Sequence, residues 1–221
     1  MSANDRLIRY LYSLKHEDTG TLAALRRACG QRLAESRNCQ WFASVSTSPA
    51  DFLTATLVAQ YPSDKIKKGQ HSCKYQYKGS IGAAWARYCR DSDPKLDPAT
   101  FYRERQDALA RGQDPPRPRS IHERFRTLLD AELEVDGTGE LAYRLRGLIR
   151  MLVAKDIPID VIQLAYDLRG WRGESRYVQE RWARAFYSPP STGKNAAATS
   201  DEEDEAEALE SQDQEEDENV D

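Results

Sequence analysis

Apolar residues recur at about every third or fourth position along most of this chain, and this helical period is the feature that most constrains its fold. The clearest apolar stripe consists of Ile121, Phe125, Leu128, Leu129 and Leu133. No segment shows a competing alternation of apolar and polar residues, which would mark a half-buried strand. The sequence therefore predicts an all-α protein.

The first half of the chain predicts five helices, over residues 6–14, 19–33, 49–60, 81–89 and 98–110. Ser48 followed by Pro49 is typical of a helix N-terminus. Residues 62–79 are polar, rich in Lys and interrupted by Gly, so we expect an exposed basic loop there. A proline-rich break over residues 114–119 predicts a domain boundary.

The second half predicts four helices joined by short connections, which is typical of a compact bundle. Ser120 and Glu123 form a capping-box pattern that predicts a helix start at Ile121. The other helices are expected over 140–155, from about 160 to 170, and over 174–187. We therefore expect two small helical domains, 1–116 and a four-helix bundle over 117–188. A tail over 189–221, poor in large apolar residues, is expected to be disordered.

The formal net charge of −4 hides an uneven distribution of charge. Residues 191–221 hold thirteen Asp and Glu and one Lys, whereas residues 1–190 hold 31 Lys and Arg against 23 Asp and Glu. The body is therefore basic, by +8, and the acidic tail masks it. A basic body favours polyanionic partners, because its cations neutralise phosphates and release counterions.

Helical geometry places several arginines outside the apolar stripes. Arg146 and Arg150 lie four residues apart, with Tyr143 beside them and Gly147 between, where a nucleic-acid backbone can approach and a base can stack. Each such pair on its own also fits an ordinary solvated helix face. The predicted nucleic-acid-binding residues are Arg26, Arg27, Lys67, Lys68, Arg119, Arg124, Arg126, Arg146, Arg150 and Arg181.

Catalytic and metal sites are not predicted. The four cysteines lack CxxC spacing, and His71 with Cys73 has no partner pair of ligands nearby. No Ser/His/Asp or Cys/His arrangement stands out, so we expect no enzyme activity and no cofactor. No apolar run reaches the length of a membrane span, and Arg6 and Arg9 interrupt the first apolar run, so no signal peptide is recognised. We expect a cytoplasmic protein with reduced cysteines.

Several segments, in order along the chain, resemble the CasB family, the small subunit of the type I-E CRISPR surveillance complex (Cascade). They cover roughly residues 20–187, and the resemblance is diffuse between 36 and 79. The segments are TLAALRRA from Thr21, SIGAAWA from Ser80, SIHERFRTLL from Ser120, LRGLIR from Leu145, IPID from Ile157 and ERWARAFY from Glu180.

This resemblance implies a non-catalytic, two-domain helical subunit that is present in two copies. Its implied partners are the backbone-forming and large subunits of the complex, the second copy of itself, the guide RNA and the target DNA. A DNA duplex and the RNA–DNA hybrid that replaces it have nearly equal free energies, so a few contacts with the nucleic-acid backbone can shift the equilibrium between them. The acidic tail departs from the short forms of the family.

Two other classes of function stay open at this point. A helix-turn-helix regulator would need a recognition helix, and the nearest candidate is residues 157–170, whose face is apolar and acidic. A helical adaptor would use the basic faces to meet acidic proteins instead.

Overall fold

The structure, a computed structural model, describes Tyr10, residues 19–61 and residues 79–189. Every regular element in these residues is a helix, which confirms the all-α class. The α-helices are α2 (Thr19–Ala28), α3 (Pro49–Val58), α5 (Ile81–Ser92), α6 (Pro98–Ala110), α7 (Ser120–Leu129), α8 (Glu140–Ala154), α9 (Val161–Gly170) and α10 (Tyr177–Tyr187). Short 3₁₀ helices are η1 (Leu33–Glu35), η2 (Arg37–Ser44) and η3 (Pro94–Leu96).

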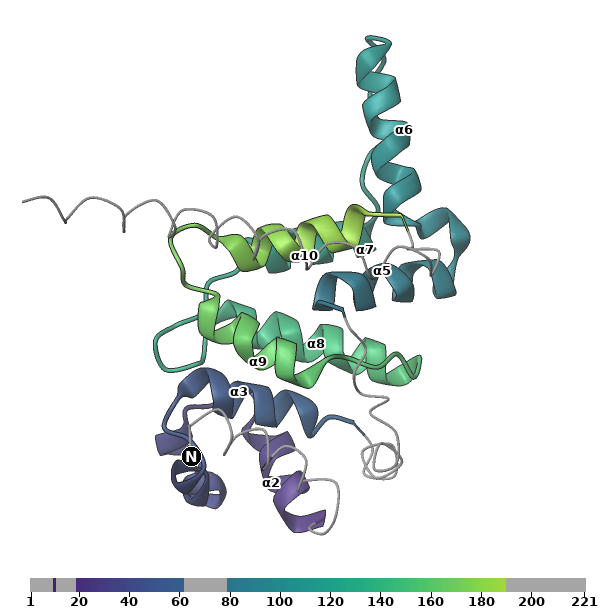
Figure 1. The fold of residues 1–221 in the computed structure, drawn as a ribbon. Coiled ribbons are helices and arrows are strands. Elements are labelled where there is room, and N and C mark those ends of the chain that lie inside the picture. The colour runs from purple at the N-terminus through teal and green to yellow at the C-terminus, as the bar shows by residue number, and fades with distance from the viewer. Residues whose placement is uncertain (1–9, 11–18, 62–78, 190–221) are drawn as a thin grey trace, which may run out of the picture. The chain divides into compact units, whose positions relative to one another are not determined.

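Helices α8 and α9 form a middle layer within residues 19–188 (Figure 1). On one side of this layer, helix α3 packs against both α8 and α9, and α2 packs against α3. On the other side, α5 and α7 pack against α8, and α10 packs against α9, α7 and α5. On both sides of the α8–α9 layer, a helix from the first half of the chain therefore packs against a helix from the second half.

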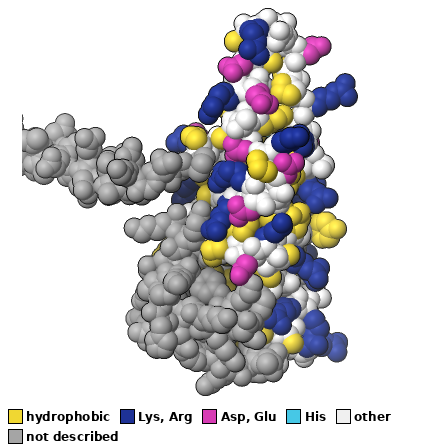
Figure 2. Space-filling view, turned by 90° about the vertical axis from the view of Figure 1, so that its right-hand side faces the viewer, with side chains coloured by type: hydrophobic (Ala, Val, Ile, Leu, Met, Phe, Trp, Pro, Cys, Tyr) yellow, Lys and Arg dark blue, Asp and Glu magenta, His cyan; other side chains and the backbone are white. Residues whose placement is uncertain are grey.

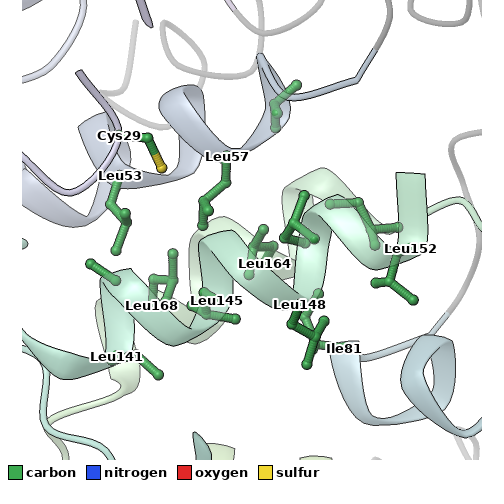
Figure 3. Packing of buried hydrophobic residues seen from close by; sticks show 14 of the residues in the cluster. Cys29, Leu53, Leu57, Ile81, Leu141, Leu145, Leu148, Leu152, Leu164 and Leu168 are labelled. Carbon is green, nitrogen blue, oxygen red and sulfur yellow. The ribbon is translucent and has the colours of Figure 1, made fainter. Parts of the chain in front are cut away.

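A single cluster of buried apolar side chains runs through these layers. Cys29, Leu53 and Leu57 face Leu164 and Leu168 from across the boundary between α3 and α9 (Figure 3). On the far side of α8, Ile81 of α5 lies near Leu148 (Figure 3). The stripe predicted on α8 is thus buried as expected, because it contacts neighbours on two sides. Its members Leu141, Leu145, Leu148, Ile149 and Leu152 are at most 6 % exposed.

Helix α6 differs from the others, because only Pro98, Ala99 and Ala108 on it are buried. It extends away from the layers in Figure 1. Asp97 caps its N-terminus by accepting a hydrogen bond from the Thr100 backbone N–H at 3.1 Å. The proline-rich segment then returns along it, where Arg105 donates to the Pro116 carbonyl oxygen at 3.3 Å.

Several predicted helix ends are wrong in detail. The first described helix ends at Ala28, well before residue 33, because Gly30 takes a left-handed φ of 85°. The capping box at Ser120 does not form. Arg119 is the N-cap of α7 and makes no side-chain cap hydrogen bond, while Glu123 pairs with Arg126 at 2.9 Å. The 3₁₀ helix η2 was not predicted at all.

The predicted boundary near residue 116 stays a prediction, although α3 and α5 on one side of it pack against α9 and α10 on the other. The predicted helix over 6–14, apart from Tyr10, lies outside the described residues. So do residues 62–78 of the basic loop, and the tail from residue 190. Among the helices that are described, none is long and apolar enough to cross a membrane.

Candidate nucleic-acid interface

A groove of about 500 Å³ opens between α7 and α8, with Trp85 of α5 at its wall. We call it the arginine groove. Its lining residues are Trp85, Arg124, Leu128, Tyr143, Arg144, Arg146, Gly147, Leu148, Arg150 and Met151. Four of them are arginines and none is acidic, so the groove is a concave surface of positive charge.

The amphipathic pattern of α8 produces one wall of this groove. Because the leucine stripe of α8 is buried, the opposite side of the helix must face outward. Tyr143 on that side is 80 % exposed. A Cβ added to Gly147 would meet no atom within 4 Å, so the backbone itself is open to a close approach there. Both features match the sequence prediction for this helix.

Helix α7 supplies the other wall and brings a distant residue into the site. Arg124 is exposed and its guanidinium lies 3.7 Å from the sulfur of Met151 on α8. Arg150 is also exposed, and no hydrogen bond or ion pair joins its guanidinium to another described residue. These two arginines therefore have charge available for an anionic ligand.

Two further arginines of the groove are held from within the protein. Arg144 pairs with Glu140 at 2.5 Å and donates to the Thr127 hydroxyl at 3.1 Å, so it joins α8 to α7. Arg146 is half-buried and donates to the carbonyl oxygen of Cys29 at 3.4 Å. Arg144 was not among the predicted site residues; its spacing of four residues from Glu140 is typical of an intrahelical ion pair.

The positive charge of the groove also acts on the buried thiol of Cys29. Burial raises the pKa of this thiol, whereas a hydrogen bond with Thr56 and the charges of Arg146 and Arg150 oppose that rise. Figure 2 shows one face of the described surface, where Lys and Arg side chains recur down the right-hand edge beside hydrophobic ones, with Asp and Glu side chains among them. The arginine groove thus combines cations with apolar and aromatic side chains, a combination that single-strand-binding surfaces also use.

Other predicted site residues lie outside the groove and have partners inside the protein. Arg26 donates to the carbonyl oxygens of Ala59 and, at 2.9 Å, of Tyr61, where it closes the C-terminal end of α3. Arg181 pairs with the buried carboxylate of Asp167. A helical wheel places these two side chains outside the apolar stripes. In the folded protein, however, they bind hydrogen-bond acceptors from other parts of the chain and are partly buried.

The other predicted residues that the structure describes are more exposed. Arg27 is exposed beside Arg26, Arg119 lies 4.0 Å from Asp93, and Arg126 pairs with Glu123. Lys67 and Lys68 lie outside the described residues. The groove therefore gathers Arg124, Arg146 and Arg150 from the predicted set and leaves the others elsewhere.

Metal-ligating side chains do not cluster in the described residues. Within them, no group of three His, Cys, Asp or Glu side chains is placed to hold a metal ion. The acidic residues Asp130, Glu132, Glu134 and Asp136 lie in the connection between α7 and α8.

Comparison with known proteins gives the family. A search of curated protein sequences finds no significant match. Among solved structures, a CasB from M. ruber is 27 % identical, with a TM-score of 0.55 over 85 % of this chain and 93 % of that one. A CasB from Thermus thermophilus is 23 % identical, with a TM-score of 0.54 over 85 % of this chain and 99 % of that one.

A chain of a CRISPR RNA-guided surveillance complex is 19 % identical, with a TM-score of 0.58 over 84 % of this chain and 91 % of that one, and it shares the fold. A family model described as CRISPR-associated protein Cse2 matches residues 21–187. Since that match spans most of the sequence, this chain belongs to the CRISPR-associated Cse2 (CasB) family.

Proposed function

We propose that this chain is the small, non-catalytic subunit of a cytoplasmic type I-E CRISPR surveillance complex. In this proposal it stabilises the displaced DNA strand and the guide RNA–target DNA hybrid through contacts with the sugar-phosphate backbone. Its partners are the guide RNA, the target DNA, the backbone-forming and large subunits, and a second copy of itself. Family membership and the fold shared with a chain of a surveillance complex support the subunit role.

The arginine groove is the single observation that carries the nucleic-acid part of the proposal. Arg124 and Arg150 present guanidinium groups that no described carboxylate neutralises, and Gly147 leaves the backbone between the arginines of α8 uncovered. Guanidinium groups bind phosphate through paired donors in a fixed geometry. Tyr143 adds a ring on which an unpaired base can stack.

Backbone contact, and not base reading, suits a complex of this kind. Guide pairing already selects the sequence, so a subunit that holds the strands must accept any target. The alternative of a helix-turn-helix regulator is less well supported. Helix α9, its nearest candidate for a recognition helix, is packed between α3 and α10 and buries Leu164, Ala165 and Leu168.

An equilibrium titration across a salt series tests this proposal. Arg124→Ala and Arg150→Ala are each expected to weaken binding equally for two unrelated DNA sequences. The slope of log affinity against log salt is expected to fall by about one for each contact removed. Arg103→Ala is the matched control, because Arg103 is an exposed arginine on α6 that lies outside the groove.

The outcomes separate the open classes of function. Loss of affinity for one sequence only would point to base readout and a regulator. Unchanged affinity for both sequences would point to an adaptor whose basic face meets protein. In the assembled complex, joint replacement of Arg146 and Arg150 by Ala is expected to weaken target-DNA capture while guide RNA stays bound. Cleavage of DNA or RNA by the purified chain with any divalent metal would overturn the non-catalytic assignment.

A further inference from the structure

The arginine groove carries more positive charge than the described residues neutralise. No ion pair within those residues reaches Arg124 or Arg150, although both line the groove. The lining also presents apolar surface, because the ring of Tyr143 is 80 % exposed and Met151 is half-buried. An occupant that matches this surface is therefore anionic and carries an apolar side chain.

The chain itself contains a segment of this composition. Residues 201–210, with the sequence DEEDEAEALE, hold seven Asp and Glu, no Lys or Arg, and Leu209. We call them the first acidic run. The second acidic run, residues 213–218, holds five Asp and Glu and no apolar residue. Both runs lie outside the described residues. Only the first run combines negative charge with a large apolar side chain, so it is the better match to the groove.

The end of α10 lies beside one wall of the groove. The ring of Phe186 packs against Phe125 of α7, with the ring centroids 4.2 Å apart, and Phe125 directly follows Arg124. Helix α7 has ten residues, so it is about 15 Å long and about 10–12 Å across. Thirteen residue steps lead from Ser188 to Asp201, and a chain of that length can span up to about 43 Å. The first acidic run is therefore long enough in reach to pass around α7 to the groove.

Attachment to the same chain makes even a weak contact effective. A segment tethered by a short linker has an effective concentration on the order of millimolar. A contact with a dissociation constant of about 0.1 mM is then formed in about nine chains out of ten. A DNA strand that needs the same arginines must displace the segment, which lowers the apparent affinity for DNA about tenfold.

We propose that the first acidic run occupies the arginine groove of its own chain when no nucleic acid is bound. Its carboxylates accept hydrogen bonds from Arg124 and Arg150. Leu209 covers the exposed ring of Tyr143 and the side chain of Met151. Docking of the run does not depend on nucleic acid, whereas its effect as a competitor of DNA rests on the proposed function of the groove. General shielding by the charge of the tail would use any of its carboxylates, but docking selects this run.

Carbodiimide coupling of the full chain tests the docking without nucleic acid. The reagent joins a lysine amine to a carboxylate in contact with it, and Arg150→Lys places an amine in the groove while keeping the charge. Mass mapping of peptides is expected to show position 150 linked to carboxylates of residues 201–210 within one chain. Arg103→Lys is the matched control, because Arg103 is exposed on α6 outside the groove, and it is expected to give few such links.

Titration with single-stranded DNA at low salt tests the competition. Glu202→Gln with Glu203→Gln removes two charges from the first acidic run. Glu215→Gln with Glu216→Gln removes the same charge from the second run and is the matched control. The first pair is expected to tighten DNA binding about threefold more than the second pair, because only the first pair weakens contacts with the groove.

The apolar part of the contact is tested in the same titration. Leu209→Ser is expected to tighten DNA binding, whereas Val220→Ser, which changes an apolar residue outside both runs, is expected to leave it unchanged. Three results would contradict the docking. They are equal effects of the two pairs of Gln variants, equal linking at positions 150 and 103, or links that join only different chains. The last result would assign the groove to the tail of a second copy.

Failure of the docking and failure of the proposed function give different results. Links from position 150 to the first acidic run, together with DNA binding that Arg124→Ala and Arg150→Ala leave unchanged, would support the docking and contradict the proposed role of the groove. Weakened DNA binding in those two variants, without preferential linking to the first run, would support the proposed function and contradict the docking.

Discussion

Arg146 on α8 donates a hydrogen bond to the carbonyl oxygen of Cys29, at 3.4 Å, so a side chain that lines the arginine groove also holds the end of α2. Cys29 and Arg146 lie 117 residues apart in the sequence. The groove wall and the packing of the N-terminal helix therefore share one guanidinium. We therefore expect binding and stability to be coupled at Arg146 and separate at Arg150, which lies one turn further along α8.

Replacement of Arg146 and Arg150 one at a time tests this coupling. Arg146→Ala is expected to lower the free energy of unfolding by about 1 kcal/mol, because a half-buried hydrogen bond is lost. Arg150→Ala is expected to change it by no more than about 0.5 kcal/mol, as is usual for an exposed position. Both variants are expected to bind DNA more weakly. Urea unfolding and a DNA titration measure the two effects, and equal stabilities would show that the contact with Cys29 contributes nothing.

Arg26 and Arg27 form a neighbouring pair with opposite expectations. Arg26→Ala removes the donors that close the C-terminal end of α3, so the free energy of unfolding is expected to fall by about 1–3 kcal/mol. Arg27→Ala removes the same charge from an exposed position and serves as the control. Thermal and urea unfolding measure the difference. If the two variants unfold alike, the cap on α3 has no energetic role.

Gly147 allows stability and DNA binding to be tested with two separate substitutions. Gly147→Ala is expected to raise the free energy of unfolding by up to about 1 kcal/mol, because Ala favours the helix and has room. Gly147→Leu is expected to weaken DNA binding by filling the groove, with the helix intact. Ala154→Leu adds the same side chain to α8 outside the groove lining. Comparable loss of binding in both leucine variants would rule out a steric role for the groove.

The acidic tail is expected to oppose phosphate binding, because its charge of −12 is tethered to a body of +8. A chain truncated after Pro190 should bind single-stranded DNA more tightly than the full chain at low salt. The difference should shrink as salt rises, since salt screens both charges. Titration of both forms across a salt series measures this. Equal affinities at low salt would contradict it.

Cys89 is expected to make the stability of the protein depend on pH in the alkaline range. Burial raises the pKa of its thiol from 9.0 to about 12, so the unfolded chain loses this proton first. The free energy of unfolding is therefore unaffected by Cys89 below pH 9.0. Above it, stability should fall by as much as about 1.4 kcal/mol per pH unit until the folded thiol ionises. Urea unfolding at several pH values, with Cys89→Ala as the comparison, isolates this effect. A parallel pH dependence in the two proteins would contradict it.

The sequence by itself determined the helices and the outward face of α8. Leu141, Leu145 and Leu148 repeat at helical spacing, so a packing that buries this one stripe places Tyr143 and Gly147 on the opposite side of the helix. The charge excess of the body likewise follows from residue counts alone. Local rules were less reliable at the ends of helices. The pattern at Ser120 fits a capping box, yet the helix includes Ser120, because the position of a helix end depends on what packs around it.

Only the tertiary structure decided which arginines share a surface. Arg124 reaches the groove because α7 packs against α8, and no spacing in the sequence encodes that contact. The acceptors that draw in Arg26 and Arg181 lie 33 and 14 residues away, beyond the reach of a helical wheel. Helical period acts over neighbouring turns, whereas charge pairing acts through space, so the first can be predicted from one sequence and the second requires the fold.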